Sequence, residues 1–285
     1  MRLIFFGAGY CSKFLIPLVG NSFEIICTHN DVIKEEKFDK KFNVQRYTFK
    51  NFCKNSKNIL KSSQYIINSI PPNGDSDIVV NSFEQELSNF SDSIKWYGYL
   101  SSTSVYGDHM GEWVNEDSIL KPKTTRGKLR LSAEKENYRL FEKYNIPVHI
   151  FRLPGIYGPG RSICQKIKKN PLVINKPGHY FSRIFVEDIA SALEKSIFNP
   201  TPGNIFNLTD NLPERIDVVA EYAASLMNIR LESIDIRDKR INQKTLDFYK
   251  ENKKVSNKKI KSMLDWKPKF EDYKLGIKKI LDSDL

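Results

Sequence analysis

The sequence has few cysteines and no apolar segment of membrane-spanning length. Its four cysteines (Cys11, Cys27, Cys53 and Cys164) are scattered and include no Cys-x-x-Cys pair, which argues against a disulfide scaffold or a zinc site. The four histidines lack metal-ligand spacing, so we expect no metal. No run reaches the roughly 18 apolar residues of a membrane helix, and the first apolar run is too short for a signal peptide. We therefore expect a cytoplasmic protein without a membrane partner.

Acidic residues are also in deficit. The chain has 45 Lys and Arg against 34 Asp and Glu, a formal net charge of +11. A basic surface can attract nucleic acid or small anions. Here the lysines alternate with apolar helix positions instead of forming one block, and no nucleic-acid motif accompanies them. We expect a solvated surface and no nucleic-acid partner.

What the sequence does contain is a regular alternation of short apolar strands and helices. Strands are predicted over residues 2–6, 23–28, 63–70, 95–101, 148–153, 182–186 and 204–208. Helices are predicted over residues 10–19, 75–90, 126–144, 187–198, 214–227, 240–252, 256–264 and 271–282. Such alternation is typical of an α/β fold, a Rossmann doubly wound parallel sheet. Ligands bind such sheets at the carboxyl ends of the strands.

A glycine-rich turn follows the first predicted strand directly. The segment Gly7-Ala8-Gly9-Tyr10-Cys11-Ser12 opens a helix, where backbone N–H groups and the helix N-terminus can hold a pyrophosphate. Ser12 replaces the third glycine of the usual motif and is small enough for close packing. We assign cofactor binding to Gly7, Ala8, Gly9, Tyr10 and Cys11, and expect residues 1–155 to form an NAD(P)-binding Rossmann domain.

The end of the second strand bears on which dinucleotide binds. NAD sites place an acid there, whereas NADP sites prefer a cation or a small polar group. Thr28 and His29 occupy this place, and the first acid is Asp31. This pattern favours NADP slightly over NAD. The alternative, in which Asp31 reaches back to the ribose of NAD, remains open.

Four segments in order resemble the extended and atypical short-chain dehydrogenase/reductase family, which includes nucleotide-sugar epimerases and dehydratases. They are Ser101-Ser-Thr-Ser-Val-Tyr-Gly107, Arg152-Leu-Pro-Gly-Ile-Tyr-Gly-Pro-Gly-Arg161, Arg183-Ile-Phe-Val-Glu-Asp-Ile-Ala190 and Trp266-Lys-Pro268. The resemblance runs over nearly the whole chain. The strand and helix pattern becomes less regular after Gly160, and we expect residues 156–285 to supply the rest of the sheet, interleaved with a small, mostly helical region that caps the substrate.

The resemblance also implies catalytic positions. Ser102, or Thr103 beside it, corresponds to the residue that hydrogen-bonds the substrate oxygen. The family's catalytic Tyr and the Lys four residues later fall on Arg126 and Arg130. Arginine is always protonated and is a poor proton shuttle, but it can act as a fixed charge. The usual Tyr-x-x-x-Lys pair is therefore missing.

Three interpretations of this gap remain open. In the first, Tyr106 replaces the missing proton donor, although an aromatic at this position more often packs beside the cleft. In the second, Arg126 and Arg130 hold a phosphate or carboxylate while water completes proton transfer. In the third, the protein binds the dinucleotide without catalysis, as a regulator or redox sensor.

The resemblance extends to residues around the ligands. It places Ser69, Ile70, Pro71 and Pro154 against the cofactor and Tyr157, Arg161 and Arg183 against the substrate. It implies an NAD(P)-dependent oxidoreductase or epimerase acting on a small polar molecule, sugar-nucleotide or anionic. It also implies a possible homodimer formed through residues 75–90 and 126–144.

Overall fold

The computed structural model describes residues 1–30, 35–74 and 76–283 and divides into two compact units. The first unit consists of Met1–Ser102, Lys128–Arg152 and Ile189–Phe206, and the second of Thr103–Gly127, Leu153–Asp188 and Asn207–Leu285. Each unit is therefore assembled from three separate stretches of chain. Within the described ranges, no helix is long and apolar enough to cross a membrane.

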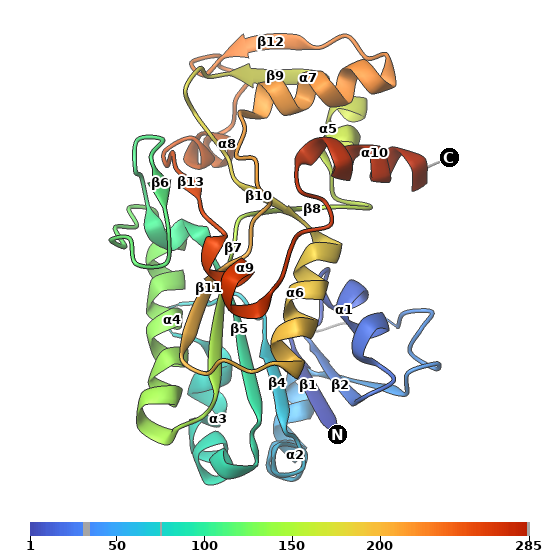
Figure 1. Cartoon of the computed structure of the whole chain (residues 1–285), viewed down its shortest axis with the longest axis vertical. Coiled ribbons are helices and arrows are strands. Elements are labelled where there is room, and N and C mark those ends of the chain that lie inside the picture. The colour runs from blue at the N-terminus through green and yellow to red at the C-terminus, as the bar shows by residue number, and fades with distance from the viewer. Residues whose placement is uncertain (31–34, 75, 284–285) are drawn as a thin grey trace. The chain divides into compact units, whose positions relative to one another are not determined.

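A seven-stranded sheet forms the centre of the first unit (Figure 1). Its strands are β1 (Arg2–Phe6), β2 (Glu24–His29), β3 (Val44–Thr48), β4 (Tyr65–Asn68), β5 (Trp96–Ser102), β7 (Val148–Leu153) and β11 (Asn204–Asn207), in the order β11-β7-β5-β4-β1-β2-β3. The pairs β1–β2, β1–β4, β2–β3 and β4–β5 are parallel. The predicted doubly wound Rossmann fold is confirmed.

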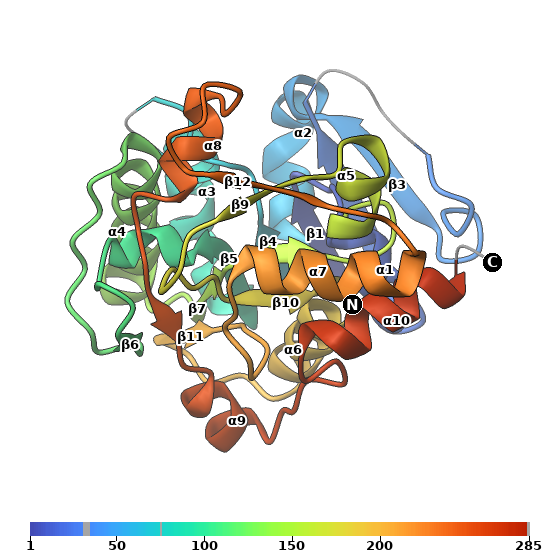
Figure 2. The ribbon, with the colours of Figure 1, turned by 90° about the horizontal axis from the view of Figure 1, so that it is seen from above.

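Helices cover both faces of this sheet (Figure 2). They are α1 (Ser12–Val19), α2 (Phe49–Lys61), α3 (Ile78–Asn89), α4 (Thr125–Tyr144) and α6 (Val186–Phe198). On the face of α2, α3 and α4, the Phe6 ring packs against Phe52 at 5.1 Å and Phe83 at 5.6 Å between centroids. On the opposite face, Trp96 donates its indole N–H to Ser196 of α6.

Strand β3 and helix α2 were not predicted from the sequence. All five residues of β3 are only partly buried at the sheet edge, so the strand shows no apolar alternation. Helix α2 is polar, with Phe52, Ser56 and Leu60 as its buried positions at a spacing of four. It begins because the Thr48 side chain accepts a hydrogen bond from the Asn51 N–H at 3.2 Å, a standard N-cap.

Three two-stranded parallel ladders and several helices form the second unit. The ladders pair β6 (Trp113–Val114) with β13 (Lys254–Val255), β8 (Gly155–Tyr157) with β10 (Arg183–Phe185), and β9 (Leu172–Asn175) with β12 (Glu232–Asp235). The helices are α5 (Ile163–Lys169), α7 (Ile216–Met227), α8 (Gln243–Phe248), α9 (Lys258–Leu264) and α10 (Tyr273–Ser283). Helices α5, α7 and α10 share one apolar core that includes Ile167, Val219 and Ile277.

The helix predicted over residues 240–252 is wrong in extent. Helix α8 covers only Gln243–Phe248. The Asn252 N–H donates to Asp108 Oδ1 at 2.9 Å, and the Asn252 carbonyl accepts from the N–H groups of His109 and Gly111. These distant partners replace the hydrogen bonds that a longer helix would make, so tertiary contacts override the local apolar spacing.

Buried His149 makes the stability of the first unit depend on pH. Its Nε2 accepts the Thr201 N–H at 2.8 Å, its ring stacks on Trp96, and burial lowers its pKa from 6.5 to about 4. Above pH 6.5 the ring is neutral in both folded and unfolded chains, so it adds no pH dependence. Between about pH 6.5 and 4 only the unfolded chain takes up the proton, which lowers the free energy of unfolding by up to about 1.4 kcal/mol per pH unit.

We therefore expect denaturant unfolding at pH 7, 6 and 5 to show falling stability. His149→Gln, which keeps polar atoms but does not titrate in this range, should flatten that dependence. Equal slopes for the wild type and the variant would contradict this assignment to His149.

Candidate functional site

The loop after β1, which is predicted to bind the cofactor, has a backbone that only glycine fits at its first position. Gly7 has φ +74°, and a Cβ there would lie 2.8 Å from Ile70 Cγ1 and 3.1 Å from the Ile70 nitrogen. Glycine is therefore required at this position. A Cβ at Gly9 would meet only the Gly7 carbonyl oxygen, at 3.7 Å. The space beside Gly9, at the N-terminal end of α1, fits the close approach of a pyrophosphate.

Neighbouring strands hold this loop in place. The Gly7 N–H donates to Thr28 Oγ1 at 3.1 Å, and the Ala8 N–H donates to the Thr28 carbonyl at 2.9 Å. From the other side, Ser69 Oγ donates to the Gly7 carbonyl at 2.8 Å. Thr28 and Ser69, both predicted as cofactor contacts, therefore support the shape of the loop. Ser12 also supports it, since its Oγ donates to the Gly9 carbonyl at 2.7 Å.

The predicted cofactor residues of the first unit gather at one edge of the sheet. Strands β2, β1, β4 and β5 are neighbours and parallel, so their carboxyl ends lie side by side. The loop residues at these ends are Gly7, Ala8, Gly9, Tyr10 and Cys11 after β1, His29 at the end of β2, Ser69, Ile70 and Pro71 after β4, and Ser102 at the end of β5. This arrangement matches the ligand edge of a doubly wound sheet.

An arginine that the sequence analysis missed lies against His29. Arg46 of β3 places Nη1 2.9 Å from His29 Nε2. It also donates to both carboxylate oxygens of Asp39, at 2.6 and 2.7 Å. Burial, and then the charge of Arg46, lower the pKa of His29. Asp31, the alternative ribose partner, lies outside the described residues.

Arg130, one of the predicted catalytic residues, is anchored to the sheet. Its Nη1 donates to the Leu100 carbonyl at 3.0 Å and to the Tyr99 hydroxyl at 3.3 Å. Ser102 follows two residues after Leu100 and is partly exposed. The guanidinium of Arg130, which lies on α4, is thus held against β5, the strand that ends at Ser102. Ser102 carries the hydroxyl predicted to bind the substrate.

A buried ion pair joins Glu134 of α4 to Arg152 of β7. Arg152 Nη2 donates to Glu134 Oε2 at 2.9 Å, and both side chains are at most 4% exposed. Ser101 Oγ donates to Glu134 Oε1 at 2.5 Å. Glu134 therefore ties helix α4 to β5 and β7, one residue before Ser102.

The other predicted catalytic residues belong to the second unit. Tyr106 is fully buried, and its hydroxyl donates to Asn207 Oδ1 at 2.8 Å. Thr103 is also buried, while Arg126 is exposed in the first turn of α4. Gly107 follows Tyr106 and has φ +72°. A Cβ there would overlap the Lys121 carbonyl oxygen, so this position requires glycine.

The predicted substrate residues of the second unit have different environments. Arg161 is exposed, whereas Tyr157 and Pro154 of the same segment are partly buried. Arg183 is buried, and its Nη2 donates to the Glu214 carbonyl at 3.0 Å. Its Nη1 has no hydrogen-bond partner in the described part of the chain. Arg183 thus has one buried donor that these residues leave without a partner.

The chain is similar in sequence and structure to a protein of known structure over nearly its whole length. No family model matches the chain. A functionally unknown conserved protein from Silicibacter pomeroyi DSS is 32% identical, with TM-score 0.88, over 99% of this chain and 98% of that chain. At this identity and coverage, the chain and that conserved protein belong to one family.

Solved structures of lower sequence identity share this fold. A dTDP-glucose 4,6-dehydratase from Bacillus anthracis in complex with NAD is 16% identical, with TM-score 0.77, over 100% of this chain and 97% of that chain. A UDP-glucose 4-epimerase from Thermotoga maritima with UDP-glucose is 14% identical, with TM-score 0.77, over the full length of both. An uncharacterized UDP-glucose epimerase, YtcB of Bacillus subtilis, is 32% identical over 90 residues, 29% of this chain and 28% of that protein. The chain therefore matches less than a third of the length of that relative.

Proposed function

We propose that this protein binds NADP(H) or NAD(H) in its first unit and oxidises, reduces or epimerises a small polar substrate, sugar-linked or anionic. The observation that carries the proposal is the loop after β1, which requires glycine at Gly7 and leaves space beside Gly9. The bound dinucleotide would donate or accept a hydride. The names of similar structures, which mention NAD and UDP-glucose, support this reaction class.

Ser102 and Arg130 are the residues proposed to act on the substrate in this unit. The Ser102 hydroxyl donates a hydrogen bond to the reacting oxygen. Arg130, held by the Leu100 carbonyl, stabilises negative charge that develops there. Because arginine does not release its proton and the Tyr106 hydroxyl is engaged by Asn207, we propose that a water transfers the proton.

A non-catalytic regulator or redox sensor that binds NAD(P) is the second candidate. It is favoured by the replacement of both Tyr and Lys by Arg126 and Arg130. Incubation with each dinucleotide and a panel of UDP-sugars and sugar acids separates the two candidates. Change in NAD(P)H absorbance, or epimerised sugar detected by NMR, supports the enzyme. Dinucleotide binding without any turnover supports the regulator.

We further propose that NADP is the preferred dinucleotide. Arg46, beside the end of β2 and fixed by Asp39, is the cation that would bind the 2′-phosphate, with His29 next to it. We expect Arg46→Leu to weaken NADPH binding at least about tenfold, roughly 1.4 kcal/mol, with little change for NADH. Calorimetric titration measures both affinities.

The matched control is Arg2→Leu, which removes an arginine paired with Glu24 at the amino end of the sheet. It should leave both affinities unchanged. An Arg46→Leu variant that loses NADPH and NADH equally would show that Arg46 supports the fold and does not select the cofactor.

A further inference from the structure

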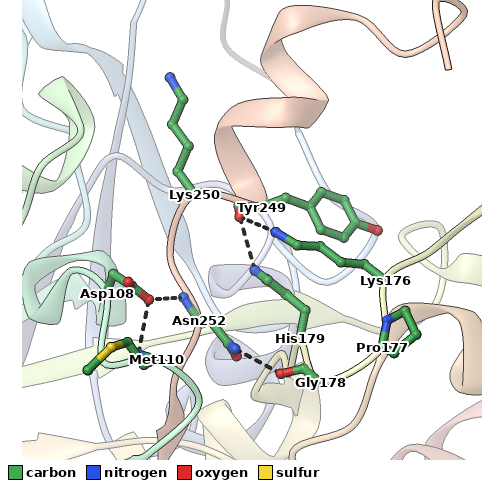
Figure 3. Close-up of a pocket in the computed structure, with 9 residues that line it drawn as sticks. All are labelled: Asp108, Met110, Lys176, Pro177, Gly178, His179, Tyr249, Lys250 and Asn252. Atoms are coloured by element: carbon green, nitrogen blue, oxygen red, sulfur yellow. Dashed lines mark hydrogen bonds between the residues drawn. The ribbon is translucent and has the colours of Figure 1, made fainter. Parts of the chain in front are cut away.

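A small pocket in the second unit is lined by side chains that the proposed function does not use (Figure 3). It measures about 210 Å³. Three segments form it: the turn after Gly107, the turn after β9 and the segment after α8. All three belong to the second unit, so the pocket is complete within it.

Lys176 gives this pocket a positive charge. Its Nζ donates to the Tyr249 carbonyl oxygen at 2.9 Å and lies 5.6 Å from the centre of the Tyr249 ring. An ammonium group has three N–H donors. Within the described residues, Lys176 has no carboxylate partner. Two of its donors are therefore available to a ligand, on a side chain that the carbonyl already holds in place.

His179 supplies a neutral acceptor in the same pocket. Its Nε2 lies 3.2 Å from the Tyr249 carbonyl. Because a carbonyl only accepts, Nε2 carries the proton and Nδ1 presents a lone pair. Nδ1 is buried without a partner in the described residues. Burial, and then the charge of Lys176, lower the pKa of His179 to about 4, so the ring stays neutral near pH 7.

Asn252 links the three segments of the pocket through hydrogen bonds. Its N–H donates to Asp108 Oδ1 at 2.9 Å, and its Nδ2 donates to the Gly178 carbonyl at 2.8 Å. The Met110 N–H also donates to Asp108 Oδ1. These bonds connect the three segments and engage the carboxylate of Asp108 with backbone donors.

Lys250, the other cation of the lining, differs from Lys176. Its side chain extends away from the remaining pocket residues (Figure 3) and forms an ion pair with Asp247 at 2.7 Å. Among the described lining residues, Lys176 is thus the cation whose charge is not matched by an ion pair.

We propose that this pocket binds a small hydroxylated anion, with a carboxylate or phosphate oxygen on Lys176 Nζ and a hydroxyl group donating to His179 Nδ1. A charge-assisted hydrogen bond suits the first contact, and the neutral histidine requires a donor for the second. The pocket volume suits a molecule of about one sugar ring. That this anion is the substrate's own charged end rests on the proposed function, whereas the binding itself does not.

The test uses the full chain without dinucleotide and three probes: glucuronate, glucose 6-phosphate and neutral glucose. Calorimetry measures affinity, and ¹⁵N NMR of the His179 ring reports the environment of Nδ1. We expect at least one of the two anions to bind and to shift the Nδ1 resonance, while glucose does neither. The two anions distinguish a carboxylate ligand from a phosphate ligand.

Variants locate the binding. Lys176→Met, which keeps the aliphatic stem, should weaken binding of the anion at least about tenfold, or 1.4 kcal/mol. Lys176→Arg should retain it. Lys168→Met, the same change at an exposed position of α5, should have no effect. If Lys176→Met does not fold, the Lys176→Arg variant and the His179 resonance decide the question.

The proposal would be overturned if neither anion binds and moves the His179 resonance, or if the wild type and Lys176→Met bind with equal affinity. NADPH titration of the same samples keeps the two proposals apart. A protein that binds NADPH but neither anion retains the proposed function and loses this site. A protein that binds an anion but no dinucleotide retains this site and loses the proposed function.

Discussion

Gly9→Asp is expected to abolish dinucleotide binding while the protein stays folded. A side chain at Gly9 meets only one carbonyl oxygen at 3.7 Å, so the fold accepts it. The new carboxylate then points into the space proposed for the pyrophosphate, where juxtaposed like charges cost several kcal/mol. We expect a loss of at least about 100-fold in affinity for NADPH and NADH, roughly 2.7 kcal/mol, measured by calorimetry.

The matched control places the same charge at the amino ends of the strands, opposite the carboxyl ends where the loop lies. Ser22 is exposed just before β2 begins, so Ser22→Asp should leave dinucleotide binding unchanged. Thermal unfolding of both variants checks that the fold survives. A Gly9→Asp protein that is folded and binds with wild-type affinity would show that the dinucleotide does not approach this loop.

Glu134→Ala is expected to destabilise the first unit strongly. The Glu134 and Arg152 side chains are only 4% and 2% exposed. Removal of the carboxylate leaves the Arg152 guanidinium buried without its counter-charge and breaks the bond from Ser101. Such changes cost about 3–5 kcal/mol, which denaturant unfolding measures directly.

An exposed ion pair of the same unit provides the comparison. Arg139 is half exposed where it meets Glu84, and Arg139→Ala should cost less than about 1 kcal/mol. Glu134→Gln, which retains hydrogen-bonding atoms, should fall between the two. A loss below about 1 kcal/mol for Glu134→Ala would mean that the buried pair contributes little net stability.

The elements that the sequence predicts well are those in which local pattern and tertiary environment agree. Strand β1 is a short apolar run, and all of its residues after Arg2 are buried. Gly7 must be glycine because its φ is +74°, so the predicted cofactor loop is readable from residues 7–12 alone. The motif Ser101–Gly107, which contains Ser102, was likewise identified by its order along the chain.

Other features depend on contacts that no local pattern records. Arg46 was missed because β3 is a partly exposed edge strand, and its contacts with Asp39 and His29 arise only when β2 and β3 pair. The pocket around Lys176 was missed because its central acceptor is a backbone carbonyl, that of Tyr249. The helix predicted over residues 240–252 gives no sign that this carbonyl would accept hydrogen bonds from Lys176 and His179.

Titration of the wild-type protein with NADPH and NADH tests the central claim most directly. Dinucleotide fluorescence and calorimetry would follow binding in parallel. The account predicts micromolar binding, tighter for NADPH than for NADH, and its loss in Gly9→Asp. Failure of the folded wild-type protein to bind either dinucleotide would contradict it, and the Rossmann sheet would then serve a different ligand.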